Sequence, residues 1–360
     1  MAARGLAGTL LLTAAVAGLT SGCATVGYYG QAVAGHLDLV QRARPVSDWL
    51  ADPATPEPLR RQLELAQQLR RFAVQELALP DNRSYTRYAA LDRPAVVWNV
   101  VAAPELSLQL KTWCFPVAGC VGYRGYFDRA AAQATAEALR RQGWEVGVYG
   151  VPAYSTLGRT EFLGGDPLLS TFVGGPPTEL ARLLFHELAH QVVYVGDDTA
   201  FNEGYATAVE RLGLELWLQR HGTPALRAQH EAIEARRADF RRLALAARAE
   251  LQALYEGPGS DDDKRAGKAR AFAALREGHR ALKAGPWQGF AGYDPRFDRA
   301  NNATLGVQAA YDELVPAFQA LFEREGRSFA RLHAAVAELA ALPRQERRQR
   351  LAGLDAAAPR

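Results

Sequence analysis

The stretch LLFHELAHQVVYVGDDTAFNEGYA, residues 183–206, combines two histidines and several acids with a long apolar run. It contains the pattern H-E-x-x-H, in which His186 and His190 are four residues apart. Positions i and i+4 of a helix lie on one face, so both imidazoles can point at one metal ion. Glu187 lies about 100° around the helix, where a general base for a metal-activated water belongs. The alternative is two unrelated histidines on an amphipathic helix.

The flanking residues predict where this helix begins and ends. Pro176 and Pro177 precede Thr178, which we expect to be the N-cap. Gly196, Asp197 and Asp198 break the helix, and Asp198 or Thr199 can cap the next one. Two helices joined by such a short turn can pack antiparallel, so the first turn of the second helix can return to the metal.

A catalytic zinc site needs a third protein ligand and an open position for water. Glu203, in the first turn of the second helix, is the best candidate. Glu210 and Glu215 lie further along, and we expect them to face solvent. The alternative for Glu203 is an acid that only stabilises a helix N-terminus.

The segments H-E-L-A-H and N-E-G-Y-A resemble the gluzincins, zinc metallopeptidases with two His ligands and one Glu ligand. N-E-G-Y-A is close to the N-E-G-F-A of the M1 aminopeptidases, although the spacing is shorter and the sequence has no G-A-M-E-N segment. A closer similarity, over nearly the whole mature chain, is to a bacterial family of putative aminopeptidases that are predicted lipoproteins. Besides the zinc segment, its matching stretches are residues 27–46, 113–127, 151–160 and 301–311.

This resemblance implies a zincin-like peptidase with one Zn²⁺ per chain, held by His186, His190 and Glu203, with Glu187 as the base. It also implies a small mixed sheet beside the H-E-x-x-H helix, whose edge borders the cleft and accepts a peptide substrate as an added strand.

A peptidase also needs a donor for the oxyanion, and gluzincins usually supply it from the region after the Glu ligand. Tyr311 or Tyr293 is our candidate, with Asn301 and Asn302 shaping the substrate cleft. Alternatively, Asn302 only caps the helix that follows, and Tyr311 only packs in the core.

The N-terminus is a targeting segment. After Arg4, residues 6–20 form an apolar stretch that is too short for a comfortable membrane span, and LTSGC ends at Cys23. Small residues before this cysteine resemble the bacterial lipobox, which predicts lipidation of Cys23; ordinary signal cleavage is the alternative. Ala24 favours the outer membrane, so we expect a periplasmic protein with a lipid anchor.

Export would place Cys114 and Cys120 in an oxidising compartment, where the loop CFPVAGC predicts a local disulfide. Arg124 follows this loop and is a candidate contact for the substrate. Alternatively, the neighbouring aromatic residues simply pack the loop onto the core: Tyr123, Tyr126 and Phe127.

Hydrophobic periodicity predicts an α+β, mostly helical fold. Residues 57–79 and 127–143 are predicted helices, and residues 94–103, 144–155 and 166–173 are predicted strands. The later helices lie at about 205–220, 224–255, 262–284, 303–324 and 327–341, with an exposed loop at 257–264. We interpret the long helices between 224 and 284 as part of a C-terminal bundle beside the cleft.

The sequence predicts four segments. They are a lipoprotein signal peptide (1–22), an N-terminal segment (23–56), an α/β region forming the cleft edge (57–175), and the zinc-binding helices with the helical C-terminal region (176–360). We expect residues 23–360 to form one compact catalytic unit.

Composition is that of a globular protein, with 48% hydrophobic and 22% charged residues. A net charge of +3 without a basic aromatic surface argues against nucleic acid as a partner. The sequence therefore predicts a zinc-dependent peptidase, an aminopeptidase by resemblance. The competing hypotheses are an envelope lipoprotein that keeps the fold as a scaffold, and a zinc hydrolase of a non-peptide amide.

Overall fold

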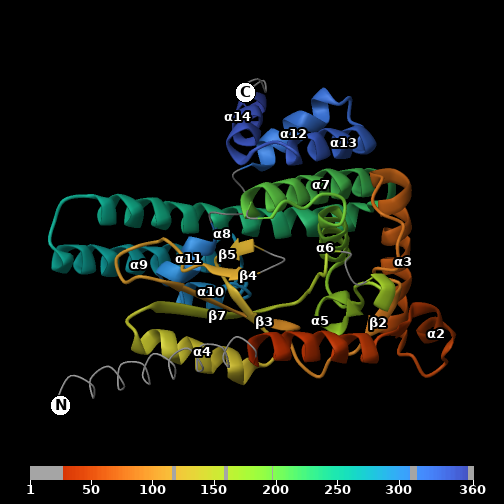
Figure 1. Cartoon of the computed structure of the whole chain (residues 1–360), viewed down its shortest axis with the longest axis horizontal. Helices are drawn as coiled ribbons and strands as arrows, with labels where there is room; N and C mark the ends of the chain where they lie inside the picture. The colour runs from red at the N-terminus through yellow and green to blue at the C-terminus, as the bar shows by residue number, and fades with distance from the viewer. Residues whose placement is uncertain (1–26, 116–118, 158–160, 197, 309–313, 356–360) are drawn as a thin grey trace, which may run out of the picture.

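The computed structural model describes residues 27–115, 119–157, 161–196, 198–308 and 314–355. Two residues with predicted roles, Cys23 and Tyr311, lie outside these ranges. Within them the chain is mostly helical with small sheets, so the predicted α+β class is confirmed (Figure 1). No helix in these ranges is both long and apolar enough to cross a membrane.

One three-stranded sheet is antiparallel and has the strand order β6-β3-β7. Its strands are β3 (Val97–Ala103), β6 (Arg124–Tyr126) and β7 (Glu145–Val151). The sequence of β3 is nearly all apolar because helices cover both faces. Val100 and Ala102 pack on α4 (Arg129–Arg141), whereas Val101 and Ala103 pack on Ala303 of α11 (Asn302–Gln308).

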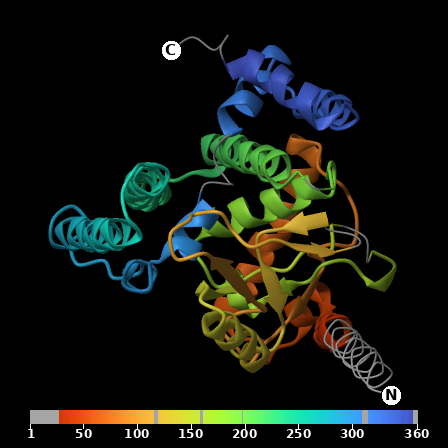
Figure 2. The same cartoon turned by 60° about the vertical axis from the view of Figure 1, so that its left-hand side comes forward.

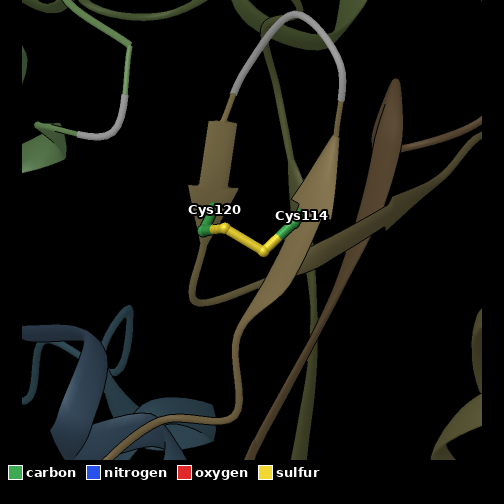
Figure 3. Close-up of a disulfide and its surroundings, with 2 residues drawn as sticks. All are labelled: Cys114 and Cys120. Carbon is green, nitrogen blue, oxygen red and sulfur yellow. A yellow bond between two sulfur atoms is a disulfide. The ribbon is translucent and has the colours of Figure 1, made fainter.

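A second sheet joins distant parts of the chain beside the candidate site. Its strands are β1 (Arg44–Pro45), β2 (Arg87–Ala89) and β8 (Leu168–Leu169). β2 pairs antiparallel with β1 and parallel with β8, so this small sheet is mixed. A separate hairpin pairs β4 (Trp113–Phe115) with β5 (Gly119–Val121). Cys114 and Cys120 lie opposite each other in this hairpin and form the expected disulfide (Figure 3).

The largest core surrounds the helix that carries H-E-x-x-H. This helix, α6 (Pro177–His190), packs against α3 (Glu57–Leu77) and α7 (Thr199–His221). Phe185 of α6 is fully buried, and its ring stacks on Phe72 of α3 at 5.9 Å between centroids. Each such buried side chain stabilises the fold by about 1.5–3 kcal/mol. The apolar face of α6 therefore fixes the position of its polar face.

Two long helices form a hairpin that extends to one side of the molecule (Figure 1). They are α8 (Pro224–Glu256) and α9 (Asp261–Ala284). Phe240, Ala244, Ala247 and Leu251 give α8 a buried stripe at helical spacing, which packs against α9 in a core of its own. Gly267 lets Leu254 approach closely, since a Cβ there would lie 2.7 Å from it.

The C-terminal helices lie over α7, at the top of both views (Figures 1 and 2). They are α12 (Val315–Arg324), α13 (Phe329–Ala340) and α14 (Arg344–Asp355). The remaining short helices are α2 (Val46–Ala51), α5 (Ser170–Val173), α10 (Asp294–Asp298) and the 3₁₀ turn η1 (Glu161–Leu163).

Several expected boundaries are wrong for identifiable reasons. The predicted strand 166–173 is a strand only at β8, because α5 begins at Ser170. The predicted helix 303–324 is described as α11 and α12, which are separate elements. The predicted loop 257–264 ends early, because Ser260 and Asp263 form a capping box that begins α9.

Thr178 is not the N-cap of α6. Pro176 occupies that position, the helix begins at Pro177, and the Thr178 hydroxyl is buried without a hydrogen-bond partner among the described residues. The cap of α7 is Asp198, one of the two predicted candidates, and its side chain accepts a hydrogen bond from the Phe201 amide.

Candidate metal centre

Three side chains from α6 and α7 converge on one point. His186 Nε2 lies 3.2 Å from His190 Nε2, and Glu203 Oε2 lies 3.3 Å from the first and 3.7 Å from the second. These are the predicted ligands, and the structure brings all three together. The sequence spacing explains this, because His186 and His190 are one helical turn apart and Glu203 lies in the second turn of α7.

The three distances fit a tetrahedral metal site. Zinc binds His nitrogen at about 2.0–2.1 Å, so two ligand atoms on one tetrahedral ion are about 3.3 Å apart. The observed distances of 3.2, 3.3 and 3.7 Å lie near this value. Two imidazole nitrogens and one carboxylate oxygen are also a ligand set that zinc accepts, with one position left for water. The residues present therefore fit the ion.

The pKa values show how strongly these groups interact. Burial alone would lower the pKa of His186, but hydrogen bonds to Glu203 and Glu210 outweigh it and hold that pKa well above its usual value. Burial would raise the pKa of Glu203, but hydrogen bonds from His186 and His190 hold it well below the usual range. Anionic carboxylates thus face the imidazoles, an arrangement that favours a cation between them.

Glu210 is where the sequence interpretation was wrong. We expected it to face solvent, but it is only 7% exposed, and its Oε2 lies 3.0 Å from His186 Nδ1. Arg182 makes an ion pair with the other carboxylate oxygen, Oε1. Burial would raise the pKa of Glu210, but His186 and Arg182 outweigh it and lower that pKa. Glu215 is exposed, as expected.

A carboxylate on Nδ1 fixes both the tautomer and the orientation of a metal-binding histidine. Glu210 is therefore in place to hold His186 with Nε2 free for a metal. A signal for this role was present in the sequence. Glu210 follows Glu203 by seven residues, two helical turns, which places both on one face of α7.

The residues around Glu203 each fix the position of α7. Asn202 exchanges two hydrogen bonds with the backbone of Val195, at 2.7 and 2.8 Å, and so closes the turn between α6 and α7. Gly204 admits α12, since a Cβ there would lie 2.9 Å from the Leu314 side chain. Tyr205 donates its hydroxyl to His333 Nδ1 at 2.8 Å. In the N-E-G-Y segment, Glu203 is thus the candidate ligand, and the other three residues hold α7 in position.

Glu187 lies next to His186 on the wall of a cavity of about 660 Å³. The cavity is lined by α5, α6 and the segment between them, together with Pro152, Glu210 and Arg237. Burial raises the pKa of Glu187, His186 and His190 oppose this, and Glu203 adds to it. A carboxylate of raised basicity beside the candidate ligands is suited to accept a proton from a water there.

The geometry agrees with the comparison with known families. The family model described as a putative aminopeptidase matches residues 27–351. The chain belongs to this family. No curated protein and no solved structure matches the chain. The matched range includes all three candidate ligands and Glu187.

The sequence interpretation treated Tyr123 only as a packing residue and did not relate it to the candidate metal ligands. It lies between β5 and β6, and although 37% of it is exposed, the surrounding protein raises its pKa. The carboxylates of Glu203 and Glu187 add to that shift. Tyr123 therefore lies in the electrostatic field of both carboxylates and is a candidate hydrogen-bond donor for a substrate.

Arg124, the residue after Tyr123, lies on the side of the sheet that α4 covers. It pairs with Val100, and its guanidinium lies 4.1 Å above the Tyr28 ring. The structure therefore gives Arg124 a packing role, and its substrate contact stays a prediction.

Tyr293 does not make a described contact with the candidate ligands. Its ring stacks on Phe240 of α8 at 4.8 Å, within the core of the α8–α9 hairpin. Tyr311, the other predicted oxyanion donor, lies outside the described residues. Their catalytic role stays a prediction, and Tyr123 is a further candidate donor because its pKa responds to Glu203 and Glu187.

Asn301 and Asn302 lie at the start of α11, where this helix packs on the sheet formed by β6, β3 and β7. Asn302 is fully buried, and its amide donates to the carbonyls of Pro104 and Glu105 at 3.1 and 2.7 Å. The Asn301 amide donates to the Val146 carbonyl at 3.2 Å. These bonds anchor α11 to β7 and to the residues that follow β3, and the role of both residues in shaping the cleft stays a prediction.

Tyr123→Phe removes the hydroxyl and keeps the ring. We expect peptide turnover to fall by about 10- to 100-fold, less than the loss of a donor acting alone, because a metal would share the charge. Tyr293→Phe tests the alternative donor that the sequence suggested, and its turnover should stay close to that of wild type if Tyr123 is the donor. Steady-state kinetics of both variants check this, and equal turnover in wild type and Tyr123→Phe would contradict the assignment.

Proposed function

We propose that this protein is a zinc-dependent peptidase of the bacterial cell envelope, an aminopeptidase in keeping with its family. The observation that carries the proposal is the convergence of His186 Nε2, His190 Nε2 and Glu203 Oε2 beside Glu187. A scaffold protein would need the ligands but has no use for the base.

Each residue of the proposed site has a separate role in the hydrolysis of a peptide bond. Zinc, when bound, supplies a Lewis acid that polarises the substrate carbonyl and lowers the pKa of water. Glu187 accepts the proton of the attacking water and then donates it to the leaving amine nitrogen. Tyr123 donates a hydrogen bond to the carbonyl oxygen as negative charge develops on it. Glu210, held by Arg182, keeps the His186 ring in its orientation.

The proposed core is zincin-like. β7 is an edge strand of its sheet in the described part of the chain, and Pro152, directly after it, lines the cavity with Glu187. An extended peptide could therefore add beside β7 and place its scissile bond near the base.

Metal removal tests the function directly. The purified protein should contain about one zinc per chain and cleave members of a peptide library that includes free and blocked amino termini. A chelator should abolish cleavage, and added zinc should restore it. Cleavage confined to free amino termini would establish an exopeptidase. If zinc is fully bound and no peptide is cut, a hydrolase of a non-peptide amide or a binding role replaces the proposal.

The envelope location rests on the sequence around Cys23, and we propose lipidation there with insertion in the outer membrane. Cys23→Ser should prevent acylation and release the protein from the membrane fraction, because acyl chains are then the anchor. Fractionation and the mass of the N-terminal peptide check this. A wild-type N-terminus without acyl mass, together with unchanged membrane association of the variant, would contradict the anchor.

A further inference from the structure

The first helix, residues 27–42, has an exposed face without charge. Tyr29, Val33 and Leu37 are 38%, 59% and 43% exposed and follow one another at intervals of four, so they share one side of the helix. Between residues 27 and 37 the other exposed positions are Gly27, Gly30 and Ala34, and Gln41 and Arg42 are exposed beyond them. The solvent side of a helix in a globular protein normally carries charged and polar residues. This face instead is apolar over its first eleven residues.

The opposite side of the same helix is firmly packed. Tyr28 stacks on Phe115 at 5.5 Å and lies beneath the Arg124 guanidinium, and Leu39 is 1% exposed. Gly35 lies against the Phe127 ring, where a Cβ would approach to 2.1 Å. The Phe127 amide also donates to Gln31 Oε1 at 3.0 Å. The helix is therefore held in one orientation, and its apolar side is fixed outward.

The segment before this helix indicates that a lipid surface covers the apolar face. If Cys23 carries acyl chains, only residues 24–26 separate the lipid from Gly27. Four Cα steps span at most about 14 Å in any conformation. The apolar stripe from Tyr29 to Leu37 is itself about 12 Å long, at 1.5 Å per residue. The stripe therefore begins within reach of the headgroup layer that holds the acyl chains.

We propose that the exposed face of this helix, formed by Tyr29, Val33 and Leu37, lies on the lipid surface and orients the enzyme on its membrane. The inference rests on the proposed lipid anchor. In both views this helix lies at the bottom of the molecule and α12–α14 lie at the top (Figures 1 and 2). The C-terminal helices therefore point away from the membrane, and α6 and α7 lie between the two ends.

A fluorescent thiol label can measure this orientation. Cys114 and Cys120 are joined and Cys23 would be acylated, so a single added cysteine is the only reactive one. Full-length lipidated Val33→Cys and Glu323→Cys, each labelled with an environment-sensitive dye, are inserted in phosphatidylethanolamine and phosphatidylglycerol vesicles. Both positions are exposed, and Glu323 lies on α12. Nitroxide lipids then report which label touches the bilayer.

The fluorescence emission of the label at position 33 should shift to shorter wavelength and be quenched by nitroxide lipids. The emission of the label at position 323 should show neither change. Leu37→Asp in the Val33→Cys background should reduce the quenching. Equal quenching at the two positions overturns the inference. A blue shift in cell membranes without nitroxide quenching also overturns it, in favour of a protein partner. A protein without acyl mass that does not float with vesicles removes the anchor and this inference together, but leaves the peptidase proposal intact.

Discussion

Glu187→Gln should leave a folded, zinc-binding protein whose peptide turnover is lower by roughly 10²–10⁴-fold, the usual scale of general-base catalysis. The amide keeps the size of the side chain and removes its basicity. Glu187 is not one of the three converging ligands, so zinc content should be unchanged. Substrate affinity should also change little, and the loss should fall mainly on kcat.

The measurement combines steady-state kinetics with metal analysis of the same preparation. Glu215→Gln is the matched control, because Glu215 is exposed on α7 and makes no contact with the metal ligands in the described structure. Equal activity in wild type and Glu187→Gln would show that the cleavage comes from a contaminant or from another site. Lost zinc in Glu187→Gln would instead place Glu187 in the coordination of the metal.

The local sequence was enough to predict which three candidate ligands converge, because little more than helical geometry brings them together. His186, His190 and Glu203 needed only two helices and a short turn. Asp198 as the cap of α7 followed from the same kind of reasoning, since Asp is a preferred N-cap.

The rest of the site depends on contacts that no local pattern specifies. Tyr123 lies between β5 and β6, eighty residues before Glu203, so the influence of Glu203 on its pKa depends on how the chain folds. Glu210 needs a buried partner, Arg182, on the neighbouring helix before its burial is favourable. Asn302 had a helix-capping alternative, but its bonds to the carbonyls of Pro104 and Glu105 depend on the fold.

The same distinction holds for the fold. α3 was predicted from its helical apolar period, and β3 from a continuous run of mostly apolar residues. The two-residue strands β1 and β8 exist only because β2 lies between them, so their sequences hold too little information. α14 was missed because its sequence is strongly charged; Arg347 and Arg348 contact the buried Asp198 at the start of α7.

Glu203→Ala should weaken zinc binding by roughly 10²–10³-fold. Zinc held by four protein ligands in small domains binds with about 10–16 kcal/mol, or about 2.5–4 kcal/mol per ligand. Alanine leaves no oxygen to replace Glu203 Oε2, and the two histidines alone cannot complete the site. The fold should persist, because the packing of α7 depends on its buried apolar side chains. Competition titration with a chromophoric chelator measures the affinity, and circular dichroism checks the fold.

Glu210→Gln tests whether Glu210 binds the metal itself or only orients the ligand His186. Its amide oxygen can still accept from His186 Nδ1, but the charge that Arg182 and His186 share is lost. We expect a loss of about 10- to 100-fold in zinc affinity, the scale for groups that hold a ligand in place. Glu215→Ala, on the same helix, should change nothing. A Glu203→Ala variant that binds zinc like wild type would remove Glu203 from the ligand set. A Glu210→Gln loss as large as that of Glu203→Ala would show that Glu210 binds the metal itself.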